Sequence, residues 1–501
     1  MRGKRAFKNI LISLILQIIT LLCGFIVPKL IIESYGSEVN GLINSITQFL
    51  GYIVLLEAGI GPVIKSCLYK PLSKKDSSEL INILNASESF FKKISIVFII
   101  YIVILSFLYP VFINNEFNSL FTISLIFIIS ISTFCEYYFG MTYRLFLKAN
   151  QESYIISYIQ IFTLILNTII TILLIRFKFS IHVVKLFSSL IFILRPLAQY
   201  YYVKRKYNFD LKKADKDYKL NQKWDGLSQH IAAVIHDNTD VVVLTLFCNL
   251  KIVSIYSVYF LVIKGIKNLI ESLTNGIDAA FGDMIAKGEI SILNKSFEKY
   301  EFLYFSIITI VFSCTFVLIT PFIYVYTSGI TDANYIQLYF GYIIVLAELI
   351  YAIRIPYNVL VLSAGKFKCM NKAAWVEAIT NILISIALVI KYGLVGVAIG
   401  TFISMLYRTI DFIILASKDI LKRKYNIIFK RVFICSNELL IIFIINSIMI
   451  NCIVVNSFVN WFIYAIIIFI FSVIVYVLLL LLFDRHKLIY IKSIKGGNVN
   501  A

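Results

Sequence analysis

The chain contains a long series of apolar blocks, each of about 20 residues, which is enough for a helix to cross about 30 Å of hydrocarbon. The first block runs from residue 10 to residue 32 and follows a basic N-terminal stretch. It is longer than a signal-peptide core, and no small-x-small cleavage site follows, so we expect it to remain as a membrane helix. Because irregular backbone is not tolerated against lipid, the blocks predict an all-α transmembrane protein.

Composition and charge exclude several other classes of protein. The chain is 60% hydrophobic and only 15% charged, whereas soluble domains are about 45–50% apolar and about 25% charged. A cytosolic enzyme, a secreted domain and a peripheral protein are therefore excluded. The net charge of +19 would suggest nucleic acid binding in a soluble protein. Here we expect the basic residues to lie in loops that face anionic lipid, and we expect no nucleic acid partner.

The hydropathy pattern predicts fourteen membrane spans. They cover residues 10–32, 43–64, 92–113, 117–140, 154–175, 181–202, 225–249, 252–282, 301–326, 335–362, 373–390, 394–416, 431–454 and 459–483. With the N-terminus inside, 36 of the 47 Lys and Arg residues lie in inside segments, four lie in outside loops and seven lie within spans. This asymmetry places both chain ends in the cytoplasm.

An internal repeat divides the predicted spans into two sets of six. Pairs of identical residues recur at offsets of 213 to 217: Ala149 and Ala364, Asn167 and Asn381, Arg195 and Arg408, Val39 and Val253, and Gly59 and Gly276. Two copies of six helices share one orientation, so we expect two six-helix bundles related by a pseudo-two-fold axis along the membrane normal. The predicted domains are a first bundle at 1–202, a cytoplasmic linker at 203–223, a second bundle at 224–416, and two extra helices with a tail at 417–501.

No catalytic motif or metal-binding pattern is present in the sequence. There is no HExxH, GxSxG or Walker-type phosphate loop, no CxxC pair among the eight cysteines, and the outside loops are short. We therefore expect a protein that is not an enzyme, with no catalytic residues, no metal and no cofactor.

Charged residues inside spans are the informative ones, because each costs about 2.5–3.5 kcal/mol at a helix centre and must face a partner or a watery cavity. Asp237 and Asp240 lie in the seventh span with His236, at i,i+3 and i,i+4 spacings that place them on one side of a helix. Two close carboxylates resist being ionised together, so this pair suits an H⁺ or Na⁺ site. The alternative is a buried charge pair that only holds helices together.

Basic residues near mid-membrane follow in the eighth and tenth spans. Lys264 and Lys267 are i,i+3, and Lys267 is spaced to pair with Glu271. They would bind either the acids of the seventh span or an anionic substrate, since lysine binds phosphate as a point charge. Arg354 lies just before Pro356, where a kink is expected.

Three further positions complete the charged set. Glu57 lies in the second span beside a Gly-Pro pair. Arg408 and Asp411 are i,i+3 in the twelfth span, and the repeat makes Arg195 the counterpart of Arg408. That symmetry favours structural charge pairs for Arg195, Arg408 and Asp411.

The stretch YGSEVNGLINSITQFLGYIVLLEAGIG at 35–61, followed by LYKPLSKKD at 68–76, resembles the polysaccharide-biosynthesis flippases of bacterial O-antigen and capsule clusters. These belong to the multidrug/oligosaccharidyl-lipid/polysaccharide exporter superfamily. The chain length, the fourteen spans, and Asp240 ahead of VVVLTLF also fit this family, so the resemblance covers nearly the whole chain.

This resemblance implies a flippase of the bacterial cytoplasmic (inner) membrane that moves undecaprenyl-pyrophosphate-linked oligosaccharide between leaflets. It implies alternating access driven by an ion gradient, H⁺ or Na⁺, and a functional link to glycosyltransferases and a polymerase in O-antigen, lipopolysaccharide or capsule biosynthesis. Lys264, Lys267 and Arg354 would then bind substrate, and Asp237, Asp240 and Glu57 would carry the coupling ion.

Two other functions stay open. A drug or organic-cation exporter of the same superfamily predicts an acidic, aromatic lumen and usually twelve spans. A polysaccharide polymerase predicts a long outside loop and an unrepeated helix arrangement. The basic residues argue against the first and the repeat argues against the second.

Overall fold

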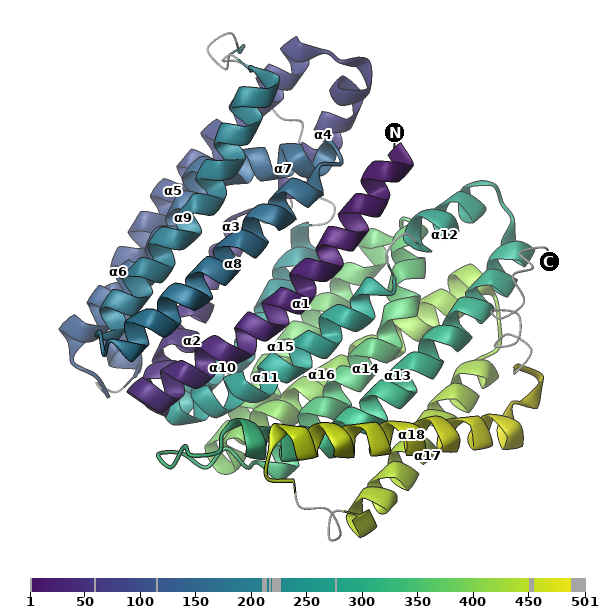
Figure 1. Cartoon of the computed structure of the whole chain (residues 1–501). Helices are drawn as coiled ribbons and strands as arrows, with labels where there is room; N and C mark the ends of the chain where they lie inside the picture. The colour runs from purple at the N-terminus through teal and green to yellow at the C-terminus, as the bar shows by residue number, and fades with distance from the viewer. Residues whose placement is uncertain are drawn as a thin grey trace. The chain divides into compact units, whose positions relative to one another are not determined.

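The computed structural model describes residues 2–57, 60–113, 116–209, 214–215, 218, 227–274, 277–449 and 455–487. These residues form helices joined by turns, and no strand occurs among them. Within this part of the chain, 13 helices are long and apolar enough to cross a membrane. The helix α10 (Leu227–Phe247) lies where the seventh span is predicted, but its polar residues lower its hydropathy. The predicted all-α transmembrane fold of about fourteen helices is confirmed (Figure 1).

The chain divides into two compact units, Met1–Ser257 and Val258–Ala501, and each is described by itself. The first unit contains α1 (Arg2–Tyr35), α2 (Ser37–Gly51), α3 (Val54–Glu57), α4 (Ile60–Lys74), α5 (Ser77–Phe112), α6 (Ser119–Cys135), the π-helix η1 (Glu136–Gly140), α7 (Met141–Ala149), α8 (Ser153–Arg176), α9 (Ile181–Tyr207) and α10. The helix α11 (Leu250–Ser272) begins in the first unit and ends in the second.

The second unit continues with α12 (Ile277–Ala286), α13 (Ile290–Tyr326), α14 (Leu338–Ser363), α15 (Phe367–Tyr392), α16 (Leu394–Ala416), η3 (Ser417–Leu421), α17 (Asn426–Met449), α18 (Phe458–Phe483) and η4 (Arg485–Lys487). The predicted domain boundaries stay a prediction. Much of the predicted linker 203–223, most of the tail after 487, and the repeat pair Gly59 and Gly276 lie outside the described residues.

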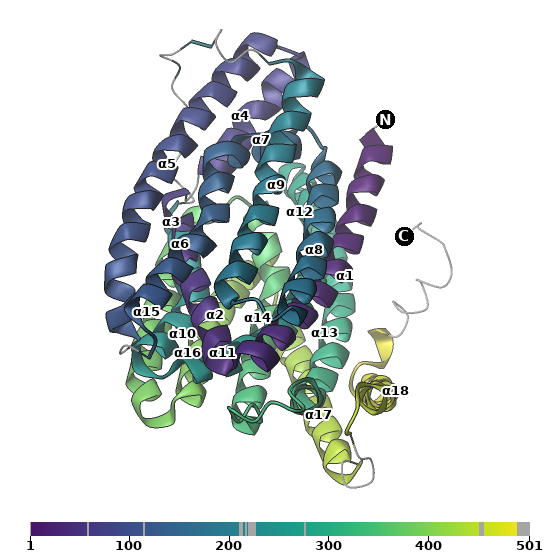
Figure 2. The same cartoon turned by 60° about the vertical axis from the view of Figure 1, so that its left-hand side comes forward.

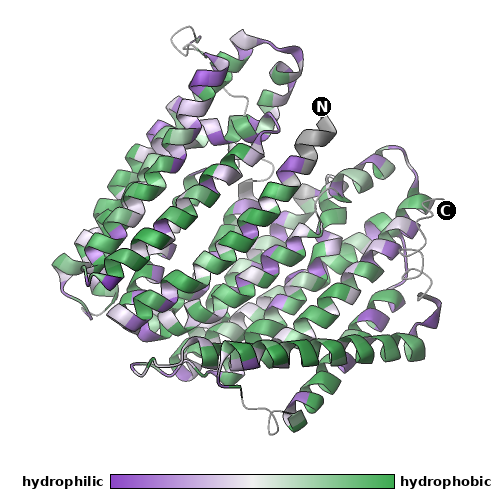
Figure 3. Cartoon of the chain, viewed as in Figure 1, coloured by the Kyte–Doolittle hydropathy of each residue, from purple (hydrophilic) through white to green (hydrophobic). Residues whose placement is uncertain are grey.

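Two predicted spans differ from the helices that form. The span predicted at 43–64 is interrupted, because α2 ends at Gly51 and the short helix α3 precedes α4. Glycine is a weak helix former, and a proline follows at residue 62. The span predicted at 252–282 is two helices, α11 and α12. Hydrophobic residues cover most of the length of the long helices (Figure 3).

The first unit has a polar contact line where α2 meets α10 and the start of α11. Asn40 donates to Ser254 Oγ at 2.7 Å, and the hydroxyls of Ser45 and Thr245 lie 2.7 Å apart. Gly41 lies directly against the Leu250 carbonyl, so a side chain at this position would clash with backbone. Small residues let membrane helices approach closely, which explains the glycine here.

In the second unit, α14 and α15 both pack against α16. Gly396 and Gly400 of α16 lie close to the backbone and side chain of α15, so the two helices make a tight hairpin. The last two helices, α17 and α18, pack on α13 through a shared apolar core (Figures 1 and 2). Ser472 of α18 donates to Glu438 of α17 at 2.6 Å inside this core.

Candidate functional site

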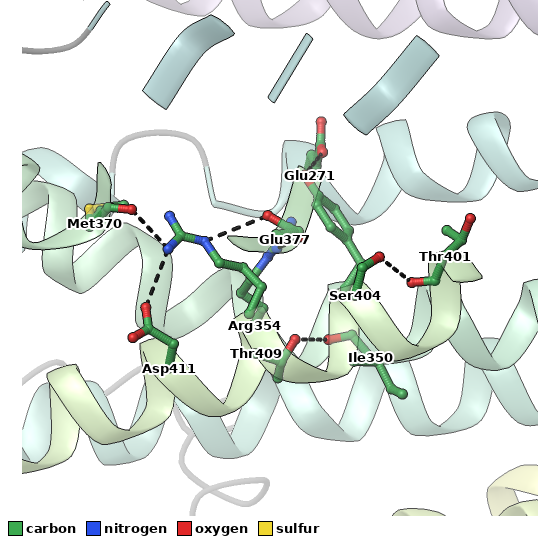
Figure 4. Close-up of polar contacts among 11 residues, drawn as sticks. Glu271, Ile350, Arg354, Met370, Glu377, Thr401, Ser404, Thr409 and Asp411 are labelled. Atoms are coloured by element: carbon green, nitrogen blue, oxygen red, sulfur yellow. Dashed lines mark hydrogen bonds and ion pairs between the residues drawn. The ribbon is translucent and has the colours of Figure 1, made fainter. Parts of the chain in front are cut away.

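Four helices of the second unit bring charged residues together around Arg354 (Figure 4). This group, the arginine cluster, contains residues from α11, α14, α15 and α16: Lys267, Glu271, Tyr351, Arg354, Glu377, Arg408 and Asp411. Tyr351 and Arg354 are one turn apart on α14, ahead of Pro356 in the same helix. Arg354 is buried, as is Arg408 on α16.

A single carboxylate joins the two arginines. Glu377 of α15 accepts a hydrogen bond from Arg354 Nη1 at 2.6 Å, and its other oxygen lies 3.6 Å from Arg408 Nε. Arg408 also donates to the Met370 carbonyl at 3.0 Å and lies 3.3 Å from Asp411. Buried charges are stable only when paired in this way, so Glu377 holds α14, α15 and α16 in one arrangement.

The ring of Tyr351 is contacted by two cations. Lys267 Nζ lies 4.0 Å from the ring centroid, and the Arg354 guanidinium lies 4.6 Å from it. The Tyr351 hydroxyl donates to Glu271 Oε1 at 2.7 Å. Lys267 and Arg354, which the sequence assigns to substrate binding, are therefore brought to one aromatic residue.

The charges of the arginine cluster balance, with three basic and three acidic side chains. Lys264, the third residue assigned to substrate binding, is exposed on α11. No ion pair involving Lys264 occurs among the residues that the structure describes. Together with the arginine cluster it leaves a surplus of one positive charge.

The acidic residues of α10 lie in different surroundings. Asp240 is buried and accepts a hydrogen bond from the Tyr256 hydroxyl at 3.0 Å. Asp237 is exposed, and its backbone carbonyl accepts from Gln48 at 3.4 Å. His236 is buried, and its Nδ1 has no hydrogen-bond partner in the described part of the chain. Positions three apart on a helix differ by about 60° around the axis, which is enough to separate the two aspartates.

Glu57 lies in a separate pocket of about 440 Å³ within the first unit. The charged pocket is lined by α2, α3, α6, η1 and α7, and its polar lining residues are Thr47, Glu57, Thr133, Glu136, Tyr137, Arg144 and Lys148. The Tyr137 hydroxyl donates to Glu57 Oε2 at 3.2 Å, and Arg144 forms an ion pair with Glu136. The π-helix η1 forms part of the wall, and such turns frequently occur at functional sites.

The hydrogen bonds of the two units repeat with the offset found in the sequence. Glu57 and Tyr137 are 80 residues apart, as are Glu271 and Tyr351, and both partners are shifted by 214. A second tyrosine–glutamate bond recurs in the same way, from Tyr143 to Glu88 and from Tyr357 to Glu301. The repeat therefore preserves contacts as well as residues.

The arginine counterparts also occupy equivalent contacts with different chemistry. Arg195 Nε donates to the Thr163 hydroxyl at 2.8 Å, whereas Arg408 Nε faces Glu377. Thr163 and Glu377 are themselves 214 residues apart. The second unit thus has a carboxylate where the first has a neutral hydroxyl, and only Arg408 of the two arginines is in a printed ion pair with Asp411.

Several residues of these sites escaped the sequence analysis. Glu377 lies near the start of a predicted span, where a charge is usually unremarkable, but its 214-residue offset from Thr163 could have drawn attention to it. Arg144 and Lys148 were expected in a cytoplasmic loop, whereas they belong to α7, which continues the helix started by α6 and lines the charged pocket. Glu136 and Tyr137 carry no sequence signal beyond lying in an apolar block.

An apolar groove of about 660 Å³ also opens on the second unit, between α14, α16 and α17. Its lining is almost wholly aliphatic and aromatic, including Leu346, Phe402, Ile413, Phe429 and Leu439.

No protein-family model matches the chain, and no curated protein sequence matches it. Solved structures do match. The lipid II flippase MurJ in an inward closed conformation has a TM-score of 0.67 and 16% identity over 96% of this chain and 100% of that chain. An inward-facing multidrug resistance MATE transporter of the MOP superfamily has a TM-score of 0.65 and 12% identity over 82% of this chain and 99% of that chain.

A eukaryotic MATE transporter, AtDTX14, is similar at a TM-score of 0.55 and 12% identity, over 84% of this chain and 99% of that chain. These proteins are transporters and flippases by their descriptions. The chain is a multi-pass membrane protein with the fold that MurJ and the MATE transporters of the MOP superfamily share.

Proposed function

We propose that this chain is a flippase that moves an undecaprenyl-pyrophosphate-linked oligosaccharide across the bacterial cytoplasmic membrane for surface polysaccharide biosynthesis. It works by alternating access, with both chain ends in the cytoplasm. Its functional neighbours are glycosyltransferases that supply the lipid-linked unit and a polymerase that consumes it.

The extent of the structural match carries this proposal. Residues 417–501 make up about a sixth of the chain, so a match over 96% of it must include most of α17 and α18. The MATE transporters match over 82% and 84%, which leaves room for both helices to be absent. Helices shared with a lipid flippase favour a lipid-linked substrate over a soluble drug.

The chemistry of the second unit supports an anionic, lipid-linked substrate. Lys264 is exposed, and Lys267 and Arg354 meet at Tyr351, so a phosphate or sugar acid would find basic groups close together. The apolar groove between α14, α16 and α17 suits a polyprenyl chain, because burying each CH₂ contributes about 0.8 kcal/mol.

The coupling ion is proposed to bind at Asp240, with Asp237 and Glu57 as further acidic groups. Asp240 is buried beside the Tyr256 hydroxyl, an arrangement in which a proton or Na⁺ would be held away from bulk water.

The test is deletion of the gene in its host, followed by analysis of lipid-linked oligosaccharide and surface polymer. The proposal expects surface polymer to vanish and the lipid-linked unit to accumulate on the cytoplasmic side. The variant Lys264→Ala/Lys267→Ala should fail to restore export, whereas Lys295→Ala, an exposed lysine of the same unit, should restore it. A unit that reaches the outer leaflet without the protein would overturn the proposal.

A drug exporter is the second candidate, and the TM-score of 0.65 with a multidrug resistance transporter favours it. It expects unchanged surface polymer in the deletion strain and increased sensitivity to cationic drugs. The two outcomes separate the candidates in one strain.

A further inference from the structure

The charged pocket of the first unit and the arginine cluster of the second share a repeated core. The Tyr137–Glu57 bond in the pocket is the counterpart of the Tyr351–Glu271 bond in the cluster. In each unit, basic side chains flank this tyrosine–glutamate pair: Arg144 and Lys148 in the first, Lys267 and Arg354 in the second.

The basic residues of the two sites do not come from equivalent positions. Positions 214 residues after Arg144 and Lys148 hold Asn358 and Leu362, and the position 214 residues before Lys267 holds Ile53. Each unit has therefore placed cations beside its tyrosine–glutamate pair from a different helix. The repeat alone does not account for this, so the combination points to a requirement of the site itself.

The two sites differ in how far their cations are already used. Arg354 and Arg408 share the Glu377 carboxylate in the second unit. In the first unit, Arg144 is paired with Glu136 through one of its terminal nitrogens, while its buried Nε has no hydrogen-bond partner in the described residues. Lys148 lines the pocket, is exposed, and forms no ion pair with any described residue.

We propose that the charged pocket of the first unit binds an acidic sugar residue of the transported oligosaccharide, such as a uronic acid. Lys148 and the free edge of Arg144 bind the sugar carboxylate, and Glu57 and Glu136 accept hydrogen bonds from the ring hydroxyls. Thr47 and Thr133, also in the lining, add neutral hydroxyls. The inference rests on the proposed function and gives Glu57 a binding role in place of the ion-coupling role that the sequence predicts.

The charge of the pocket favours a sugar acid over the pyrophosphate of the lipid carrier. Two basic and two acidic side chains line it, so its formal charge is zero. A compact, multiply charged pyrophosphate would be repelled by Glu57 and Glu136 as much as it is attracted by the two cations. A sugar with one carboxylate and several hydroxyls satisfies both kinds of group, because ionised carboxylates only accept hydrogen bonds.

The volume is consistent with this ligand. About 440 Å³ accommodates a sugar ring with water around it, and it falls within the range of about 300–1,000 Å³ for small-molecule sites.

The test uses the purified full-length protein in detergent and measures binding of three probes by calorimetry: a glucuronic-acid disaccharide, the matching glucose disaccharide, and inorganic pyrophosphate. We expect the acidic disaccharide to bind at least tenfold more tightly than the neutral one. Lys148→Gln and Glu57→Gln should each weaken it at least tenfold, Lys148→Arg should retain most of it, and Lys70→Gln, an exposed lysine outside the lining, should leave it unchanged.

Three results would overturn the inference: equal binding of the two disaccharides, full competition by pyrophosphate, or unchanged binding in both Lys148→Gln and Glu57→Gln. Circular dichroism of each variant shows whether a loss of binding reflects unfolding, and Lys148→Arg keeps the test decisive if Lys148→Gln fails to fold. Binding does not depend on transport. Selective sugar binding together with normal surface polymer in the deletion strain would retain the pocket and refute the flippase.

Discussion

Replacing Glu377 by glutamine tests whether one carboxylate holds the arginine cluster together. The substitution keeps the shape and one acceptor oxygen but removes the charge that faces Arg354 at 2.6 Å and Arg408 at 3.6 Å. Arg408 keeps Asp411 and the Met370 carbonyl as partners, so the uncompensated charge falls mainly on Arg354.

The expected cost follows from burial. The side chains of Arg354, Glu377 and Arg408 are only 11%, 9% and 3% exposed, so solvent screens their interaction weakly. Removing one partner of a buried pair costs about 3–5 kcal/mol, because the other charge stays buried. We expect Glu377→Gln to lower the free energy of unfolding by that amount.

The assay is reversible unfolding in mixed micelles, followed by circular dichroism and by the fluorescence of Trp375, two residues away on α15. Glu377→Gln/Arg354→Gln should recover part of the loss, because it also removes the stranded cation, and the double-mutant cycle gives the coupling energy. Glu289→Gln, an exposed acid of the same unit, should stay within about 0.5 kcal/mol of the wild type. A loss below about 1 kcal/mol in Glu377→Gln, or simple additivity in the double variant, would refute the reasoning.

Three other predictions concern the first unit and the topology. Gly41→Ala should destabilise the protein by about 1–3 kcal/mol in the same unfolding assay, because its Cβ meets the Leu250 carbonyl, whereas Gly51→Ala meets only Asn238 Oδ1 at 3.6 Å and should be tolerated. Asp240→Asn should make transport in vesicles insensitive to an imposed H⁺ or Na⁺ gradient, and an equal response in wild type and variant would remove the coupling role. In a cysteine-free chain, a cysteine at Glu38 should be labelled by an impermeant reagent from outside and one at Ser78 should not, and the reverse pattern would contradict cytoplasmic ends.

The fold was predictable from the sequence because the membrane imposes it. Apolar blocks of fixed length can only be helices in lipid, so the helix count and type follow from hydropathy. The helix ends were less predictable. The breaks after Gly51 and after Ser272 fall inside apolar blocks, where hydropathy does not change but local backbone does.

The candidate site was predictable in part. Lys267 and Arg354 stand out because charges are costly in spans, and they do meet at Tyr351. Their partners could not be named, because a carboxylate such as Glu377 acquires meaning only when the packing of α15 against α16 brings it to two arginines. The offset of 214 was in the sequence, and applied to Glu57 and Tyr137 it reaches Glu271 and Tyr351, but tyrosines are too common here for that match to stand out unaided.

The lengths of α5 and α13 give the molecule two built-in levers. At 36 and 37 residues, these helices are each about 55 Å long, against about 30 Å of hydrocarbon. Roughly 25 Å of each rod therefore extends past the acyl chains, and a tilt of about 20° would sweep its tip by roughly 9 Å. A spectroscopic label in the first turn of either rod would thus magnify small rotations of its own unit, and would time a transport cycle without any knowledge of the cargo.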